Sequence, residues 1–135
     1  MKNKAVKRLT AFVMSALVIG SIGTVTAEAS NWVDSNYSYD FSTKPDRTPV
    51  REKQDASSCY MSCYYSQGVY SAQVVSVVNG LNVDCAGGNY YDFQTGTTHY
   101  LTNYVYEKGY RNAAIFAIPK TAGKSATGVW SPDSI

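Results

Sequence analysis

The sequence predicts an all-β fold, a small antiparallel β-sandwich with at most one short helix. Apolar and polar residues alternate along several segments, as they do in strands with one buried face. The chain holds twelve tyrosines, and these accompany valines and threonines, which favour strands. Turn signals, of which Asn79-Gly80 is the strongest, separate the segments at short intervals. Together these features are typical of a sandwich made of many short strands.

Residues 1–29 have the pattern of a secretory signal peptide, so the domain itself is predicted to be residues 30–135. An apolar run at 9–22 follows a basic start, and the small-x-small sequence at 27–29 is a cleavage site. Because the apolar run is short, cleavage is favoured over retention as an N-terminal anchor. We therefore expect a secreted, extracellular protein of a single domain.

The first strand is predicted at 32–41, where Tyr37, Tyr39 and Phe41 alternate with polar residues. Residues 42–54 contain two prolines and six charges, which indicates an exposed loop.

Three strands are predicted next, at 57–65, 69–78 and 81–85, joined as a meander by two-residue turns. Gln67-Gly68 is the first turn and Asn79-Gly80 the second, where both residues tolerate the positive φ of a type I′ turn. This register sorts the side chains by polarity, and a slip of one residue would scramble the sorting. The predicted buried face consists of Cys59, Met61, Cys63, Tyr65, Tyr70, Ala72, Val74, Val78, Leu81, Val83 and Cys85.

The remaining predicted elements follow the meander. A short strand is predicted at 90–93. Residues 97–107 alternate as a strand would, although two helical turns ended by Gly109 fit 101–108 as well; the Thr, Tyr and Val content favours the strand. The apolar run at 113–118, ended by Pro119, predicts a central buried strand, and 121–128 is expected to be a loop.

The charge of the mature domain is close to zero. Cleavage after Ala29 removes four of twelve basic residues and one of ten acidic residues, leaving eight and nine. The mature domain therefore lacks the excess of basic residues that is typical of nucleic-acid-binding proteins. No second apolar run approaches the roughly 20 residues that span a bilayer. We therefore expect neither a nucleic-acid partner nor a membrane attachment after cleavage.

Three segments resemble a family of small secreted proteins from Gram-positive bacteria that is known only as a domain of unknown function. They are N-Y-V-Y-E-K-G-Y at 103–110, A-A-I-F at 113–116 and G-V-W-S-P-D-S at 128–134. The resemblance implies a secreted all-β protein of one domain, and it assigns no catalytic residues.

One sequence motif resembles part of an enzyme active site. Asp84-Cys85-Ala86-Gly87 resembles the D-C-S-G nucleophile motif of cell-wall cysteine peptidases, which need a thiolate at a helix N-terminus and a histidine base. The residues after Cys85 do not predict a helix, and His99 is the only histidine. A cell-wall hydrolase using Cys85 and His99 is therefore the third functional alternative, and we expect a non-enzyme.

The three cysteines leave their redox state open. The predicted meander keeps Cys59, Cys63 and Cys85 too far apart to bond, which favours three buried thiols. An extracellular location favours one disulfide, between Cys85 and either Cys59 or Cys63. With one histidine and thiols that are more often oxidised than metallated outside the cell, neither a metal nor another cofactor is expected.

A ligand-binding surface is predicted on the polar face of the meander. Tyr60 and Tyr64 project from this face, flanked by Gln73 and Asn82. Exposed tyrosines beside neutral amides suit a glycan or a protein partner, unless a second sheet covers them. The sequence thus favours a non-enzymatic binding domain for cell-wall glycan or a surface protein. The rival is a secreted bacteriocin-like toxin, against which the near-neutral charge counts.

Overall fold

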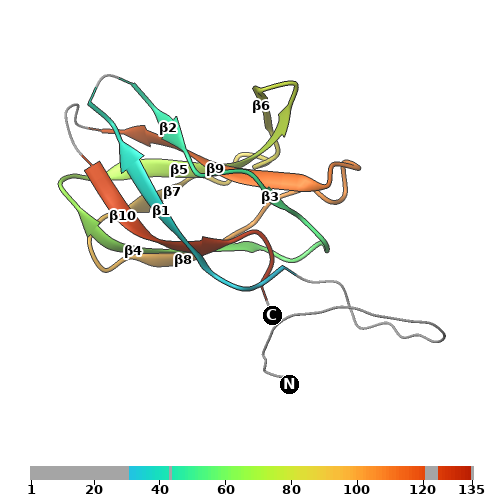
Figure 1. The fold of residues 1–135 in the computed structure, drawn as a ribbon, viewed down its shortest axis with the longest axis horizontal. Helices are drawn as coiled ribbons and strands as arrows, with labels where there is room; N and C mark the ends of the chain where they lie inside the picture. The colour runs from blue at the N-terminus through green and yellow to red at the C-terminus, as the bar shows by residue number, and fades with distance from the viewer. Residues whose placement is uncertain (1–30, 43, 121–124, 135) are drawn as a thin grey trace.

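The computed structural model describes residues 31–42, 44–120 and 125–134, and the predicted signal peptide lies outside them. Two antiparallel sheets pack against each other, and no helix occurs in the described residues (Figure 1). The predicted all-β sandwich is therefore confirmed.

The first sheet has the strand order β1-β10-β4-β8. Its strands are β1 (Ser35–Asp40), β10 (Ser125–Ser131), β4 (Cys59–Ser66) and β8 (Thr98–Leu101). β1 confirms the predicted first strand, with Tyr37 and Tyr39 buried. β10 shows that the loop predicted for 121–128 is wrong from residue 125 onward. Its Ser, Thr and Gly content gives little strand signal, but β1 and β4 pair with both of its edges.

The second sheet has the order β2-β9-β5-β6, with β3 beside β9 and β7 beside β5. The strands are β2 (Asp46–Arg47), β3 (Arg51–Glu52), β5 (Tyr70–Val78), β6 (Leu81–Asp84), β7 (Tyr91–Phe93) and β9 (Asn112–Pro119). The predicted central strand at 113–118 is confirmed as β9, although Ile118, which was predicted to be buried, is exposed. The predicted loop at 42–54 holds β2 and β3, which pair with β9 over two residues each.

The hairpin at Asn79-Gly80 is confirmed. Asn79 has φ 52° and Gly80 φ 78°, as a type I′ turn requires. Val78 pairs with Leu81 and Ser76 with Val83, as the predicted register requires. Val74 is fully buried whereas Gln73 is only half-buried, so the predicted facing of β5 is correct.

The hairpin predicted at Gln67-Gly68 is wrong. β4 pairs with β10 and β8, whereas β5 pairs with β9, so this turn carries the chain from one sheet to the other (Figure 1). The residues predicted to face inward over most of both strands do so. Cys59, Met61 and Cys63 of β4 and Tyr70, Ala72 and Val74 of β5 lie in one core. Alternation identifies the side chains that face the core, but it does not identify the neighbouring strand.

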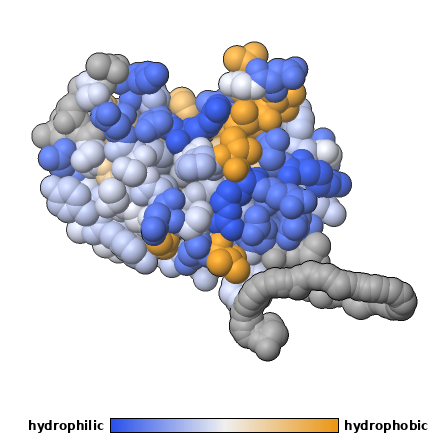
Figure 2. Space-filling view, viewed as in Figure 1, coloured by the Kyte–Doolittle hydropathy of each residue, from blue (hydrophilic) through white to orange (hydrophobic). Residues whose placement is uncertain are grey.

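Three side chains on the predicted buried face of the meander are exposed. Thr127 pairs with Tyr65 and Gly128 with Cys63, which leaves Tyr64 as the extra residue of a β-bulge. The bulge turns Tyr65 outward beside Tyr64. Val78 and Leu81 lie near the tip of the β5–β6 hairpin, where apolar side chains reach solvent (Figure 2).

The segment at 97–107 divides in two. The strand that the sequence favours is confirmed for Thr98–Leu101, and hydrogen-bonded turns follow at 105–109. The Asn103 side-chain oxygen accepts a hydrogen bond from the Val105 amide, which competes with strand pairing.

The core between the sheets is rich in aromatic rings. Neighbouring rings lie 4.9–5.6 Å apart among Tyr37, Tyr39, Phe41, Tyr70 and Phe93. The buried hydroxyls have partners: those of Tyr37 and Tyr70 are 2.7 Å apart, and that of Tyr39 donates to a backbone carbonyl of β9. All three cysteines are buried free thiols, one of the two alternatives that the sequence left open.

Candidate functional site

The structure does not bring the four predicted ligand-binding residues together. Tyr60 and Tyr64 lie on the outer face of β4 in the first sheet. Gln73 and Asn82 belong to β5 and β6 in the second sheet, where the Gln73 amide contacts Asp84. The four residues are separated because β4 and β5 lie in different sheets and do not pair, contrary to the predicted hairpin.

A shallow pocket of about 230 Å³ surrounds Tyr60. Its lining consists of Trp32, Asp34, Tyr60, Tyr100, Ser131 and Ser134. Tyr60 and Tyr100 pair directly across β4 and β8, which sets their ring centroids 5.4 Å apart at 59°. Tyr60 is half-buried, and Tyr100 is 60% exposed. The pocket therefore presents aromatic surface to solvent from two neighbouring strands.

Polar groups border these rings. Partial burial raises the pKa of Asp34, an effect that the Ser131 hydroxyl and the Arg51 guanidinium partly offset. The C-terminal segment that follows β10 supplies Ser134, whose amide is fixed by the Ser57 hydroxyl. The pocket thus combines ring faces with a carboxyl group and hydroxyls, the mixture that orients a polar ligand on an apolar floor.

Tyr100 was not among the predicted site residues. Its place in the alternating segment 97–107 was the available signal, but only the β4–β8 pairing sets it against Tyr60. Tyr64 is 62% exposed on the same strand as Tyr60, yet it does not line the pocket.

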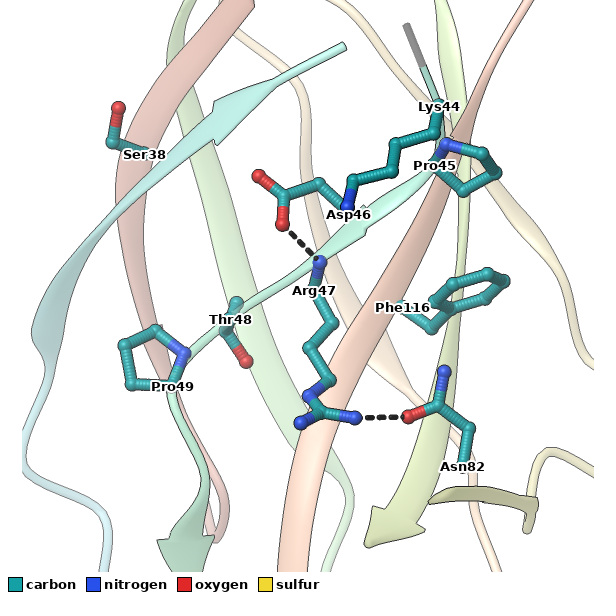
Figure 3. Close-up of a pocket in the computed structure, with 9 residues that line it drawn as sticks. All are labelled: Ser38, Lys44, Pro45, Asp46, Arg47, Thr48, Pro49, Asn82 and Phe116. Atoms are coloured by element: carbon teal, nitrogen blue, oxygen red, sulfur yellow. Dashed lines mark hydrogen bonds between the residues drawn. The ribbon is translucent and has the colours of Figure 1, made fainter. Parts of the chain in front are cut away.

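Asn82 lines a second, larger pocket of about 570 Å³. The Arg47 Nη1 donates to Asn82 Oδ1 at 2.6 Å, so this amide is engaged within the protein (Figure 3). The lining is mostly polar and basic rather than aromatic, and consists of Ser38, Lys44, Pro45, Asp46, Arg47, Thr48, Pro49, Asn82 and Phe116.

Cys85 and His99 have separate environments. Cys85 is buried after β6, where desolvation raises the pKa of its thiol; a cysteine nucleophile needs the opposite shift. His99 lies on β8 and packs against Tyr91 and Phe93 at ring distances of 5.2 and 5.1 Å. This geometry gives the hydrolase alternative no support.

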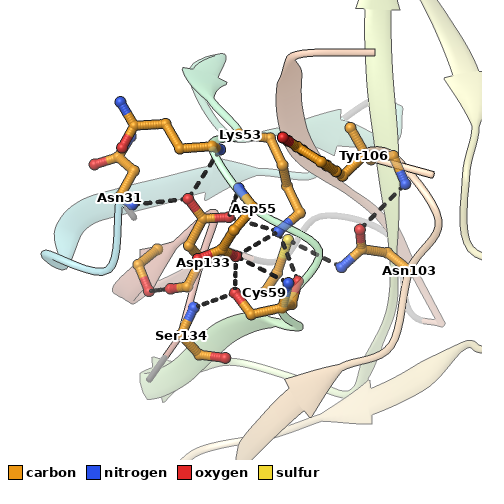
Figure 4. Close-up of polar contacts among 12 residues, drawn as sticks. Asn31, Lys53, Asp55, Cys59, Asn103, Tyr106, Asp133 and Ser134 are labelled. Carbon is orange, nitrogen blue, oxygen red and sulfur yellow. Dashed lines mark hydrogen bonds and ion pairs between the residues drawn. The ribbon is translucent and has the colours of Figure 1, made fainter. Parts of the chain in front are cut away.

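A buried ion pair includes Asp133, which lies in the chain between the pocket residues Ser131 and Ser134. Lys53 Nζ is 2.6 Å from Asp133 Oδ1, and both side chains are fully buried (Figure 4). Lys53 also donates to the Ser57 carbonyl, and Asp133 accepts hydrogen bonds from backbone amides. The sequence did not predict this pair, because lysine and aspartate are usually exposed and nothing local marks them as buried.

Two negative findings concern the described residues alone. No group of three or more His, Cys, Asp or Glu residues in them could hold a metal ion. The same part of the chain contains no helix long and apolar enough to cross a membrane.

Comparison with known proteins identifies the family. The model of DUF2712, a family of proteins of unknown function, matches residues 23–134. The chain belongs to this family. The match covers every strand of both sheets and all six residues of the aromatic pocket. Comparisons with curated proteins and with solved structures find no match. Membership in DUF2712 assigns no activity, so a function must be inferred from the geometry of the chain itself.

Proposed function

We propose that this DUF2712 protein is a secreted, non-enzymatic domain that binds cell-wall glycan in the pocket formed by Tyr60, Tyr100 and Trp32. The observation that carries the proposal is the pairing of Tyr60 with Tyr100, which presents two rings side by side in a solvent-accessible pocket. Tyrosine rings offer an apolar face and a polar hydroxyl, a combination suited to ligands with both kinds of surface.

The polar border of the pocket favours a sugar over a purely apolar ligand. A sugar ring places C–H groups on its faces and hydroxyls around its rim. Asp34 can accept hydrogen bonds from such hydroxyls, while Ser134 supplies polar atoms beside the rings. Export from the cell, which the N-terminal residues predict, would bring the pocket into contact with wall polymers. N-terminal sequencing of protein from culture medium should then begin at Ser30.

Sedimentation with purified cell walls tests the proposal. The wild-type protein should pellet with the walls, and Tyr60→Ala/Tyr100→Ala should bind at least about tenfold more weakly. Loss of two aromatic contacts worth about 1 kcal/mol each exceeds the 1.4 kcal/mol of a tenfold change. Tyr90→Ala is the matched control, since Tyr90 is similarly exposed but does not line this pocket.

Two results would contradict the proposal. One is a folded double variant that binds walls as well as the wild type does. The other is a wild-type protein that does not sediment with walls but inhibits the growth of neighbouring bacteria, which would favour the toxin alternative. Tyr64→Ala measures whether the binding surface extends along β4 beyond the pocket.

A further inference from the structure

The ion pair of Lys53 and Asp133 has an unusual environment for two charged groups. Both side chains are fully buried, with Nζ and Oδ1 2.6 Å apart. Removing such charges from water costs several kcal/mol per ion. By contrast, Lys120 and Asp92 pair at 3.0 Å with more than half of each side chain exposed. The buried pair therefore holds an amine and a carboxyl group in contact away from bulk water.

The two oxygens of the Asp133 carboxyl group have different partners. Oδ2 accepts hydrogen bonds from the backbone amides of Asn31 at 2.7 Å and Gln54 at 3.0 Å. Oδ1 faces Lys53 Nζ at 2.6 Å and accepts one longer hydrogen bond, from the Asp55 backbone amide at 3.4 Å. Two N–H groups directed at one oxygen stabilise the negative charge that develops there when a nucleophile attacks a carbonyl carbon. In this arrangement Oδ2 can hold the negative charge of the intermediate, and Oδ1 can leave.

A second carboxyl group contacts the same amine. Asp55 Oδ1 lies 4.0 Å from Lys53 Nζ, and the Asp55 side chain is 35% exposed. Asp55 Oδ1 accepts hydrogen bonds from the Ser57 amide and hydroxyl, so across this distance it exchanges a proton with the lysine through one bridging water and can pass that proton on to Asp133 Oδ1. Because Asp55 is the partly exposed member of the three, it also marks the side on which a water molecule can leave.

We propose that Lys53 and Asp133 condense to an intramolecular amide, an isopeptide bond. One proton passes from Lys53 Nζ by way of Asp55 to Asp133 Oδ1, which leaves a neutral amine beside a neutral carboxyl group. Nζ then attacks Cγ of Asp133, and Oδ2 carries the negative charge between its two N–H partners. The bond from Cγ to Oδ1 then breaks. Both protons that Nζ loses finish on Oδ1, which leaves as water. The step needs no oxidant or cofactor, and the net charge of the two side chains is zero before and after it.

The bond would tie the segment after β3 to the segment after β10. These residues are 80 positions apart, so the link closes a loop that spans most of the domain. A covalent link across a long loop restricts the unfolded chain more than one across a short loop. The three cysteines of this domain are free thiols, so the isopeptide bond would be a covalent staple in a domain without a disulfide.

Intact mass spectrometry of the protein in denaturant is the direct test. The protein from culture medium, with its N-terminus assigned by sequencing, should be lighter than its sequence by one water. Trypsin should fail to cleave after Lys53, and the peptide that contains it should be joined to the C-terminal peptide. Lys53→Arg, which keeps the positive charge, should have its full sequence mass. A wild-type protein of full sequence mass would overturn the proposal, even if the variant failed to fold.

Asp55→Asn tests the proton transfer. This variant should fold, as judged by circular dichroism, while the cross-linked fraction forms at least tenfold more slowly. That loss is expected because a general base contributes about 10²–10⁴ to a rate. A merely structural role would not alter the mass spectrum. Cross-linking at the wild-type rate would overturn the role assigned to Asp55.

Discussion

Gly128 is the position where the structure leaves no room for a side chain. It lies on β10 at the bulge, opposite Cys63. A Cβ atom there would be 2.0 Å from the backbone oxygen of Ser62 and 2.9 Å from the Tyr37 ring. An ordinary C···O approach is about 3.3 Å, so the overlap exceeds 1 Å. Because the obstructing atom belongs to the backbone of β4, a rotamer change cannot relieve it.

Gly128→Ala should therefore lower the free energy of unfolding by about 3 kcal/mol, the upper part of the range for overpacked sites. For a domain of this size, each kcal/mol lowers Tm by about 4 °C or more, so Tm should fall by at least about 12 °C. Urea titration and thermal circular dichroism measure both quantities.

Gly80→Ala is the control for this measurement. Gly80 has a positive φ of 78°, but a Cβ atom added there would have nothing within 4 Å, so alanine meets only backbone strain of about 1 kcal/mol. If Gly128→Ala cost no more than Gly80→Ala, the close approach of β10 to β4 would be wrong.

Three further changes test the core. Val74→Ala should cost about 1–3 kcal/mol in urea titration, whereas Gln73→Ala should change stability by less than about 0.5 kcal/mol; equal costs would contradict the facing of β5. Tyr39→Phe should cost about 1 kcal/mol in the same assay, because it removes a buried hydrogen bond to the Ile115 carbonyl, which keeps the Thr48 amide as its other donor; an unchanged stability would contradict that bond. Burial raises the pKa of Cys59 from 9.0 to about 12, so its contribution to stability is complete below pH 9 and is lost as the pH rises from 9 to 12. The slope, about 1.4 kcal/mol per pH unit for this thiol, should be absent in Cys59→Ala when unfolding is followed against pH.

The sequence by itself determined the features that depend on local periodicity and turn chemistry. Alternation identified the inward faces of β1, β4 and β5, and Asn79-Gly80 fixed the register of one hairpin because few residue pairs accept positive φ. The same alternation predicted that Tyr60 points outward, and in the structure Tyr60 lines a pocket. A period-two pattern is a property of one strand, so these predictions required no knowledge of its neighbours.

Only the tertiary structure decided which strands pair. Gln67-Gly68 follows one alternating segment and precedes another, as a hairpin turn does, yet here it crosses between sheets. Both arrangements direct most of the same side chains of β4 and β5 into the core, so the sequence pattern could not distinguish them. The pairing of Tyr60 with Tyr100 and the contact of Lys53 with Asp133 join residues 40 and 80 positions apart. Such contacts form only when the two sheets pack together and exclude water, so they cannot be predicted from any local segment of the sequence.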